Sequence, residues 1–158
     1  MLSLILSCFI TVGLTLFSPS VLSEPHKMDK DRSAMMKYRK LFMETKGKHA
    51  KAIKLLVKNK LSLNHIISHG EALEAMADDM LMIFPTGSMG GKSRAMDNIW
   101  DKDGNLSQDF TNKVKAMRIE ATQLVQVAEQ GNYKKIRKQM ASFANKGCRN
   151  CHSDFRGE

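Results

Sequence analysis

Apolar residues recur through most of the chain at alternating intervals of three and four, the period of an α-helix with one buried face. The segment 62–83 carries such a stripe, made of Ile66, Gly70, Leu73, Ala77, Met80 and Phe84. In the segment 106–130 the stripe is Phe110, Val114, Met117, Ala121, Leu124 and Ala128. In the segment 132–155 it is Ile136, Met140, Phe143, Gly147 and Cys151. The pattern predicts three amphipathic helices, each with one narrow apolar seam.

A fourth helix is predicted over 28–58. Its apolar stripe is doubled and consists of Met35, Met36, Phe42, Met43, Ala50, Ile53, Leu56 and Val57. Gly47 interrupts it and lowers local helix stability by about 1 kcal/mol relative to Ala, which makes this position a candidate bend. Four helices with one seam each bury those seams most simply as an antiparallel four-helix bundle, so the expected fold class is all-α.

Residues that start and stop helices agree with these limits. Ser107 or Asn105 can cap the third helix, Gly131 can end it, and Asn132 can cap the fourth. The segment 85–105 is long for a structureless link inside a bundle. We expect it to cross the bundle or cover a cofactor, with Trp100 as a candidate lid residue.

The first 23 residues contain no charged side chain and are largely apolar from Leu2 to Phe17. Together with the small residue Ser23 they predict a secretory signal peptide, residues 1–23, and a mature domain, residues 24–158. An uncleaved membrane anchor is the alternative, although an apolar run of about 16 residues is short for a span of about 20. We expect no stable membrane span after cleavage and a periplasmic location.

All charged residues lie after this segment, so the formal charge of +9 belongs to the mature domain. Lysine and arginine are spread along every segment with few aromatic residues among them, which argues against nucleic-acid binding. Acidic proteins or an anionic membrane surface are the partners that this charge favours.

The most specific motif is Cys148-Arg149-Asn150-Cys151-His152, near the carboxyl end. Two thiols three residues apart can add to the two vinyl groups of a haem, and the adjacent imidazole can reach the iron. A zinc site is weaker because the mature domain has no second cysteine pair, and a redox dithiol is weaker because its βαβ setting is absent. The motif predicts one covalent haem c, with His152 as the proximal iron ligand.

Only six residues follow His152, so a sixth iron ligand must come from upstream in the chain. We therefore expect the haem to lie between the helix that carries the motif and the other helices of the bundle.

With this motif at its carboxyl end, the chain resembles the class II c-type cytochromes, which comprise cytochrome c prime and its low-spin relatives. The resemblance covers nearly all of the mature domain. It rests on Tyr38-Arg39, Phe84-Pro85-x-Gly87-Ser88, Ile99-Trp100, and the haem motif followed by Phe155-Arg156.

The resemblance implies that the residue four positions after Arg39 faces the distal side of the haem, and this residue is Met43. A thioether there implies a six-coordinate, low-spin iron, whereas an apolar residue that does not bind implies a five-coordinate one. Arg39 resembles an arginine that contacts a haem propionate. The alternatives are that Met43 is a flexible core residue and that Arg39 is a solvated helix charge.

Three histidines are further candidates, because imidazole is a common iron ligand. His65 and His69 share a helix face and would suit a separate metal pair if a third ligand were near, but the sequence supplies none. His49, His65 and His69 are therefore expected at the surface.

The favoured function is one-electron transfer by a haem protein that is not an enzyme, with an acidic redox protein as its partner. The alternative is a five-coordinate protein of the cytochrome c prime type that binds nitric oxide or carbon monoxide. A helical scaffold without haem is a third class. The expected assembly is a monomer or homodimer.

Overall fold

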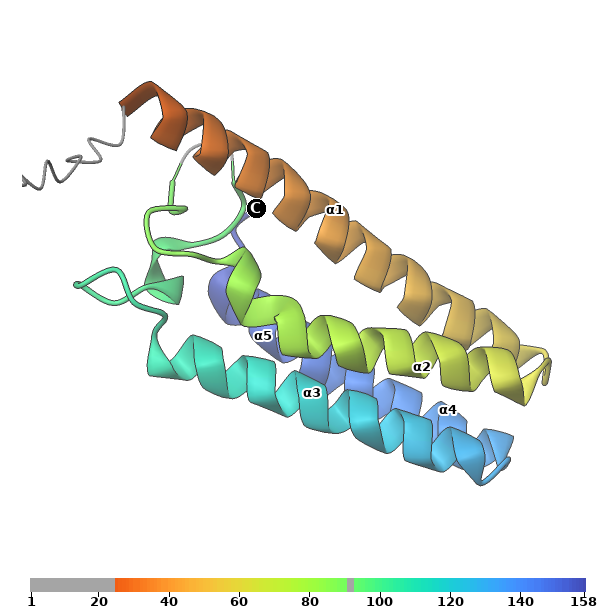
Figure 1. The fold of residues 1–158 in the computed structure, drawn as a ribbon. Coiled ribbons are helices and arrows are strands. Elements are labelled where there is room, and N and C mark those ends of the chain that lie inside the picture. The colour runs from red at the N-terminus through yellow and green to blue at the C-terminus, as the bar shows by residue number, and fades with distance from the viewer. Residues whose placement is uncertain (1–24, 91–92) are drawn as a thin grey trace, which may run out of the picture.

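The computed structural model describes residues 25–90 and 93–158, with side chains from residue 31 onward. The predicted signal peptide, residues 1–23, lies outside the described residues. Four main helices, α1 (Pro25–Lys58), α2 (Leu63–Asp78), α3 (Gln108–Glu129) and α4 (Tyr133–Ser142), run alternately up and down (Figure 1). The prediction of an all-α, antiparallel four-helix bundle is confirmed.

The carboxyl-terminal arm of the bundle is not the single α-helix expected over 132–155. After α4 the chain makes a π-helical turn, η3 (Phe143–Arg149), and then a short helix, α5 (Asn150–Phe155). A π turn holds one more residue than an α turn and thereby rotates the residues that follow it. The haem motif spans the junction of η3 and α5, so this extra residue changes the direction of its side chains relative to α4.

Two other expectations about helix shape are also corrected. The helix predicted over 62–83 ends at Asp78 and continues as a 3₁₀ turn, η1 (Asp79–Ile83). Helix α1 is one continuous α-helix from Pro25 to Lys58, so it is not interrupted at Gly47. A single glycine weakens a helix only modestly, and packing of α1 against α2 and α4 outweighs that cost.

The core is built from the predicted stripes together with Ile99 of the segment before α3. Its fully buried, larger side chains are Phe143, Ile53, Ile66, Leu73, Ile99, Leu124 and Ile136. The predicted caps are confirmed: Ser107 accepts from the backbone N–H of Phe110, and Asn132 accepts from two N–H groups of α4. Gly131 has a φ of +71°, the left-handed conformation that favours glycine at the end of a helix.

The segment between η1 and α3 lies at the end of the bundle where the chain also terminates (Figure 1). It contains a 3₁₀ turn, η2 (Asp97–Ile99), and is joined to the carboxyl terminus by an isolated bridge between Ala95 and Arg156. The backbone N–H of Met96 donates to the carbonyl of Phe155 at 3.1 Å. This segment therefore fixes the end of α5 against the bundle.

Within the two described ranges, no helix combines the length and the apolar character needed to cross a bilayer.

Candidate functional site

A largely apolar cavity of about 180 Å³ lies inside the bundle beside the haem motif. Helices α1, α2 and α3 line it together with η1, η3 and α5. Its lining residues are Met43, Lys46, Gly47, Ala50, Leu73, Met80, Phe110, Lys113, Val114, Met117, Phe143, Gly147, Cys148, Cys151 and His152.

The three chemical groups of the motif all reach this one cavity. Cys148 and Cys151 are half-buried free thiols, and His152 lies beside them at the same wall. Burial raises the pKa of both thiols, and the positive charge of Lys46 partly opposes that effect. The prediction that these residues share one site agrees with their placement.

Burial and nearby positive charges both act on the imidazole of His152. Its side chain is exposed in part, and the burial of the remainder lowers its pKa. The nearby charges of Arg156, Lys46 and Arg94 act in the same direction. An imidazole that loses its proton readily is the form that binds a metal.

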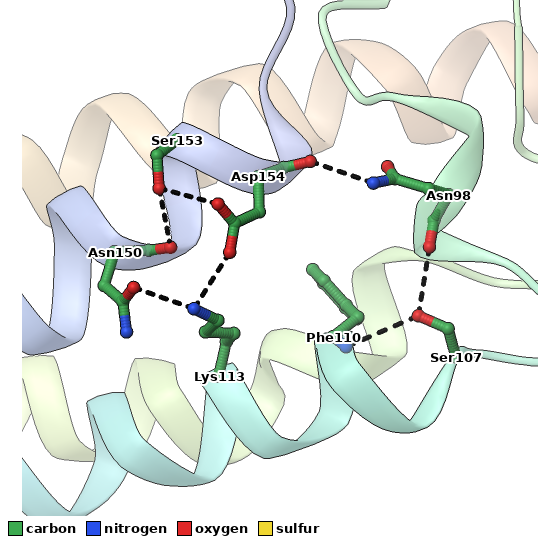
Figure 2. Close-up of polar contacts among 7 residues, drawn as sticks. All are labelled: Asn98, Ser107, Phe110, Lys113, Asn150, Ser153 and Asp154. Atoms are coloured by element: carbon green, nitrogen blue, oxygen red, sulfur yellow. Dashed lines mark hydrogen bonds and ion pairs between the residues drawn. The ribbon is translucent and has the colours of Figure 1, made fainter.

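The haem motif is held to α3 by polar contacts from Lys113 (Figure 2). The ammonium of Lys113 donates to Asn150 Oδ1 at 2.7 Å and lies 2.9 Å from Asp154 Oδ2. Ser153 Oγ donates to the carbonyl of Asn150 and to the carboxylate of Asp154. These contacts fix the turn of α5 on which Cys151 and His152 lie.

A second set of contacts ties the same turn to the segment before α3 (Figure 2). Asn98 Nδ2 donates to the carbonyl of Asp154 at 3.0 Å, and Ser107 Oγ donates to the carbonyl of Asn98 at 3.0 Å. Ser107 also caps α3, so the start of that helix and the haem motif are positioned by one connected network.

The donor set and the largely apolar lining of the cavity fit a covalently bound haem. Two thiols can form thioethers, and the imidazole is a ligand that iron accepts. Gly47 gives an independent indication, because a Cβ placed there would meet no protein atom within 4 Å. Gly47 lines the cavity, so that space is available to a bound group rather than filled by a side chain.

Met43 lines the cavity from α1 and is half-buried. It therefore lies in the same cavity as His152, as expected for a residue of the distal side. Neither its role as an iron ligand nor the alternative role as a core residue follows from this placement alone.

Arg39 does not line the cavity but is buried beside it, only 5% exposed. Its Nε donates to the carbonyl of Ile83 at 2.8 Å, and its Nη2 donates to Ser88 Oγ at 2.6 Å. The guanidinium also lies 4.3 Å from the ring centroid of Phe84. The alternative of a solvated helix charge is wrong, because these contacts bury the side chain. Contact with a propionate stays a prediction.

Trp100 is a core residue and not a lid, because it is 5% exposed and lies outside the cavity lining. Its indole N–H donates to the carbonyl of Phe84 at 3.2 Å.

The expectation that all three histidines lie at the surface holds for His65, but His49 and His69 are half-buried. His69 contacts His49 of α1, with 2.9 Å between their Nδ1 atoms, while His65 is exposed. Burial and the neighbouring His69 lower the pKa of His49. Among the residues that the structure describes, no three or more His, Cys, Asp or Glu side chains gather as a metal site.

Two lysines of the cavity, Lys46 and Lys113, were not identified from the sequence. The signal for Lys46 is its register: it follows Arg39 by seven residues and Met43 by three, on the inner face of α1. A charge within an apolar stripe is the feature that marks it. Lys113 gave no such signal, because it precedes Val114 at the edge of its stripe.

Comparison with known proteins agrees with the fold and with the motif. The family model described as Cytochrome C' matches residues 34–156. A cytochrome c' from Pararhodospirillum photometricum is 31% identical over 125 residues, which covers 78% of this chain and 96% of that protein. A cytochrome c' from Rhodospirillum rubrum is 27% identical over 130 residues, covering 81% of this chain and 85% of that protein.

Solved structures of cytochrome c prime from Alcaligenes xylosoxidans share the fold. The ferric protein and a nitric oxide complex of a variant each superpose with a TM-score of 0.70 at 22% identity. Each match covers 80% of this chain and 96% of the other. Given the extent of the family match, this chain belongs to the cytochrome c' family, whose members bind one covalent haem c, and haem c is its cofactor.

Proposed function

We propose that the chain is an exported haem protein that binds small gaseous ligands such as nitric oxide or carbon monoxide at an open iron position. The observation that carries the proposal is the largely apolar cavity that Cys148, Cys151 and His152 all line. Bound haem would supply an iron that can exchange one electron and accept a small ligand.

In this proposal Cys148 and Cys151 form the two thioether links, and His152 is the proximal ligand. The low pKa of His152 keeps its imidazole neutral and ready to bind. The tether from Lys113 to Asn150 and Asp154 holds the motif in place. Precise placement of these three groups is needed because all of them bind one rigid planar group.

The distal side is formed by Met43 together with apolar residues of α2 and α3. These apolar side chains line a cavity with space for a diatomic ligand. Family membership favours a five-coordinate iron over the six-coordinate, low-spin iron with Met43 as ligand. The nitric oxide complex of the Alcaligenes protein, which has the same fold, supports this choice.

Electron transfer with His152 and Met43 as axial ligands is the second candidate function. The observation in its favour is that Met43 lines the same cavity as His152. A thioether ligand raises the reduction potential, and the basic surface would favour an acidic redox protein as partner. No substrate chemistry is needed for either function.

The proposal includes export to the periplasm, with residues 1–23 as a signal peptide and residues 24–158 as the haem domain. The assembly is a monomer or a homodimer. No nucleic-acid partner is proposed, because the basic residues are distributed without interleaved aromatic side chains.

Optical and electron paramagnetic resonance spectra of the matured protein test the proposal. We expect a high-spin ferric spectrum and a ferrous protein that binds carbon monoxide. Met43→Ala should leave the spin state unchanged and speed carbon monoxide binding by opening the cavity. Met82→Ala is the matched control, because Met82 is 68% exposed and lies outside the cavity, so it should change neither property. A low-spin protein that becomes high-spin only in Met43→Ala would instead support electron transfer.

A further inference from the structure

Lys46 brings a positive charge into an otherwise apolar part of the cavity. It extends from the inner face of α1, is only 8% exposed, and is one of the lining residues. Its Nζ lies 2.7 Å from the thioether sulfur of Met117 on α3. The side chain therefore reaches across the cavity from one helix to another.

The ammonium of Lys46 has a poor set of partners. A thioether sulfur is a weak, uncharged acceptor. Among the described side chains, the salt bridges found do not include Lys46, whereas the other cavity lysine, Lys113, is neutralised by Asp154. Burial lowers the pKa of Lys46 to about 8, so the cation is still the main form at pH 7.

An uncompensated buried cation costs several kcal/mol, and that cost falls when a group of opposite charge or a strong acceptor enters the cavity. The two haem propionates are one source of such charge. In haem, however, the vinyl groups that thiols attack lie on the edge opposite the propionates. Lys46 lines the cavity together with Cys148 and Cys151, and its charge acts on both thiols and on His152, so it lies where the thioether links would form.

We propose that Lys46 is a specificity-determining residue of the ligand site, whose ammonium lets the ferric protein bind small inorganic anions in addition to the neutral diatomic gases of the proposed function. This inference rests on the open iron position of the proposed function. It names a further ligand class that the position accepts in the ferric protein: anions of two or three atoms with an acceptor atom at their free end, such as azide or cyanide. The donor would lie beside that acceptor, where apolar side chains alone would offer none.

Azide titration of the ferric holoprotein tests this proposal. We expect Lys46→Met to weaken azide binding by about ten- to a hundredfold, the range for loss of one hydrogen bond to a charged group. Lys46→Gln, which keeps a neutral donor, should give an intermediate loss. Lys48→Met removes the same charge from an exposed position of α1 and should leave the affinity within about twofold, because exposed charges are screened.

The stretching frequency of the carbon monoxide complex gives a second, independent readout. A positive donor near the ligand oxygen lowers this frequency, so it should rise in Lys46→Met and stay constant in Lys48→Met. Carbon monoxide affinity should change less than azide affinity, because the neutral ligand gains less from a charge.

The proposal would be overturned if the wild type and Lys46→Met had equal azide affinities and equal carbon monoxide stretching frequencies. It would also be overturned if only the reduction potential changed, because Lys46 would then act on a haem propionate. A wild-type iron with a nitrogen ligand that is lost in Lys46→Met would also overturn it, because the amine would then occupy the iron. Failure of the open site itself looks different. In that case both proteins would be low-spin with a thioether signature and would bind neither azide nor carbon monoxide.

Discussion

Two buried cations on the inner face of α1, seven residues apart, have opposite surroundings. Arg39 donates to two backbone carbonyls and two serine hydroxyls and stacks on an aromatic ring. Lys46 donates to a single thioether sulfur and faces the cavity. Both side chains are less than a tenth exposed, so burial alone does not distinguish them.

The difference separates a cation that stabilises the fold from one that is available to a ligand. The contacts of Arg39 hold the carbonyls of Ile83 and Ser88, which belong to the segment that leads to α3. Its charge is already compensated by acceptors within the protein. The charge of Lys46 has no such compensation among the described residues, so it can act on whatever enters the cavity.

The largest expected effect is that of Arg39→Met on stability. The substitution leaves buried carbonyls without a donor and removes the stacking on Phe84, so the free energy of unfolding should fall by about 3–4 kcal/mol. Urea unfolding of the holoprotein, followed by circular dichroism, measures this change. Lys40→Met is the control, because Lys40 is exposed and only 3.9 Å from Glu44 in a weak surface pair. A loss below about 1 kcal/mol for Arg39→Met would contradict the structural role.

The next effect has the opposite sign. Lys46→Met removes a charge that burial disfavours and adds an apolar side chain of similar length, so the free energy of unfolding should rise by about 1–3 kcal/mol. The same urea experiment measures it. A clear loss of stability would show that Lys46 is compensated in the way that Arg39 is.

The stability difference between the wild type and Lys46→Met should also depend on pH. The pKa of Lys46 is lowered to about 8 in the folded protein, below its ordinary value of 10.5. Between these two values the unfolded chain binds more protons than the folded protein, so the wild type becomes more stable as pH rises. The advantage of Lys46→Met should therefore be constant below about pH 8 and shrink by about 1–3 kcal/mol toward pH 10. A difference that stays constant across this range would refute burial as the cause.

A smaller effect is expected for the serine that binds Arg39. Ser88→Ala removes the hydroxyl that accepts from Arg39 and donates to the carbonyl of Pro85 at 2.7 Å, which should cost about 1–2 kcal/mol. Ser93→Ala removes only a longer contact of 3.4 Å to Arg39 and a contact with the N–H of Ala95, so it should cost less. Equal losses in the two variants would argue against the short bond as the main anchor of this segment.

The stability of the protein in acid should depend on a third buried charged residue, Glu120. Burial alone would raise the pKa of Glu120, but hydrogen bonds from Ser142, Lys146 and Gln139 outweigh it and lower the pKa. A carboxyl group whose pKa is lowered by folding stabilises the protein at pH values above its ordinary pKa. That stabilisation is lost as the pH falls through the pKa of the group in the folded protein. Glu120→Gln should therefore reduce the loss of stability below about pH 4.5, measured by thermal unfolding. An unchanged acid profile would contradict this assignment.

The helices could be predicted from the sequence because each one repeats its apolar residues with a constant period. The π turn could not, because the stripe through Phe143, Gly147 and Cys151 tolerates one extra residue without a visible break in the pattern. Gly147 within this turn packs closely against α3. A Cβ there would lie 3.3 Å from the Met117 side chain, so close approach of η3 to α3 favours glycine.

The haem motif could be predicted because its two cysteines and its histidine lie close together in the sequence. The roles of Arg39 and Trp100 could not, since they depend on how the segment 84–107 folds over the end of the bundle. The place of Lys46 in the cavity was not predicted for another reason. Periodicity identifies the apolar residues of a helix face, and it does not identify a charged residue that lies among them. Its position on that face was available in the sequence, but its partners were not.

The central claim is that Cys148, Cys151 and His152 hold one haem in this cavity. Mass spectrometry of the full chain, produced in a host that matures c-type cytochromes, tests it most directly. We expect one haem that resists extraction by acidified organic solvent, linked through both Cys148 and Cys151. Recovery of a colourless polypeptide from such a host, with both thiols free to react, would contradict it.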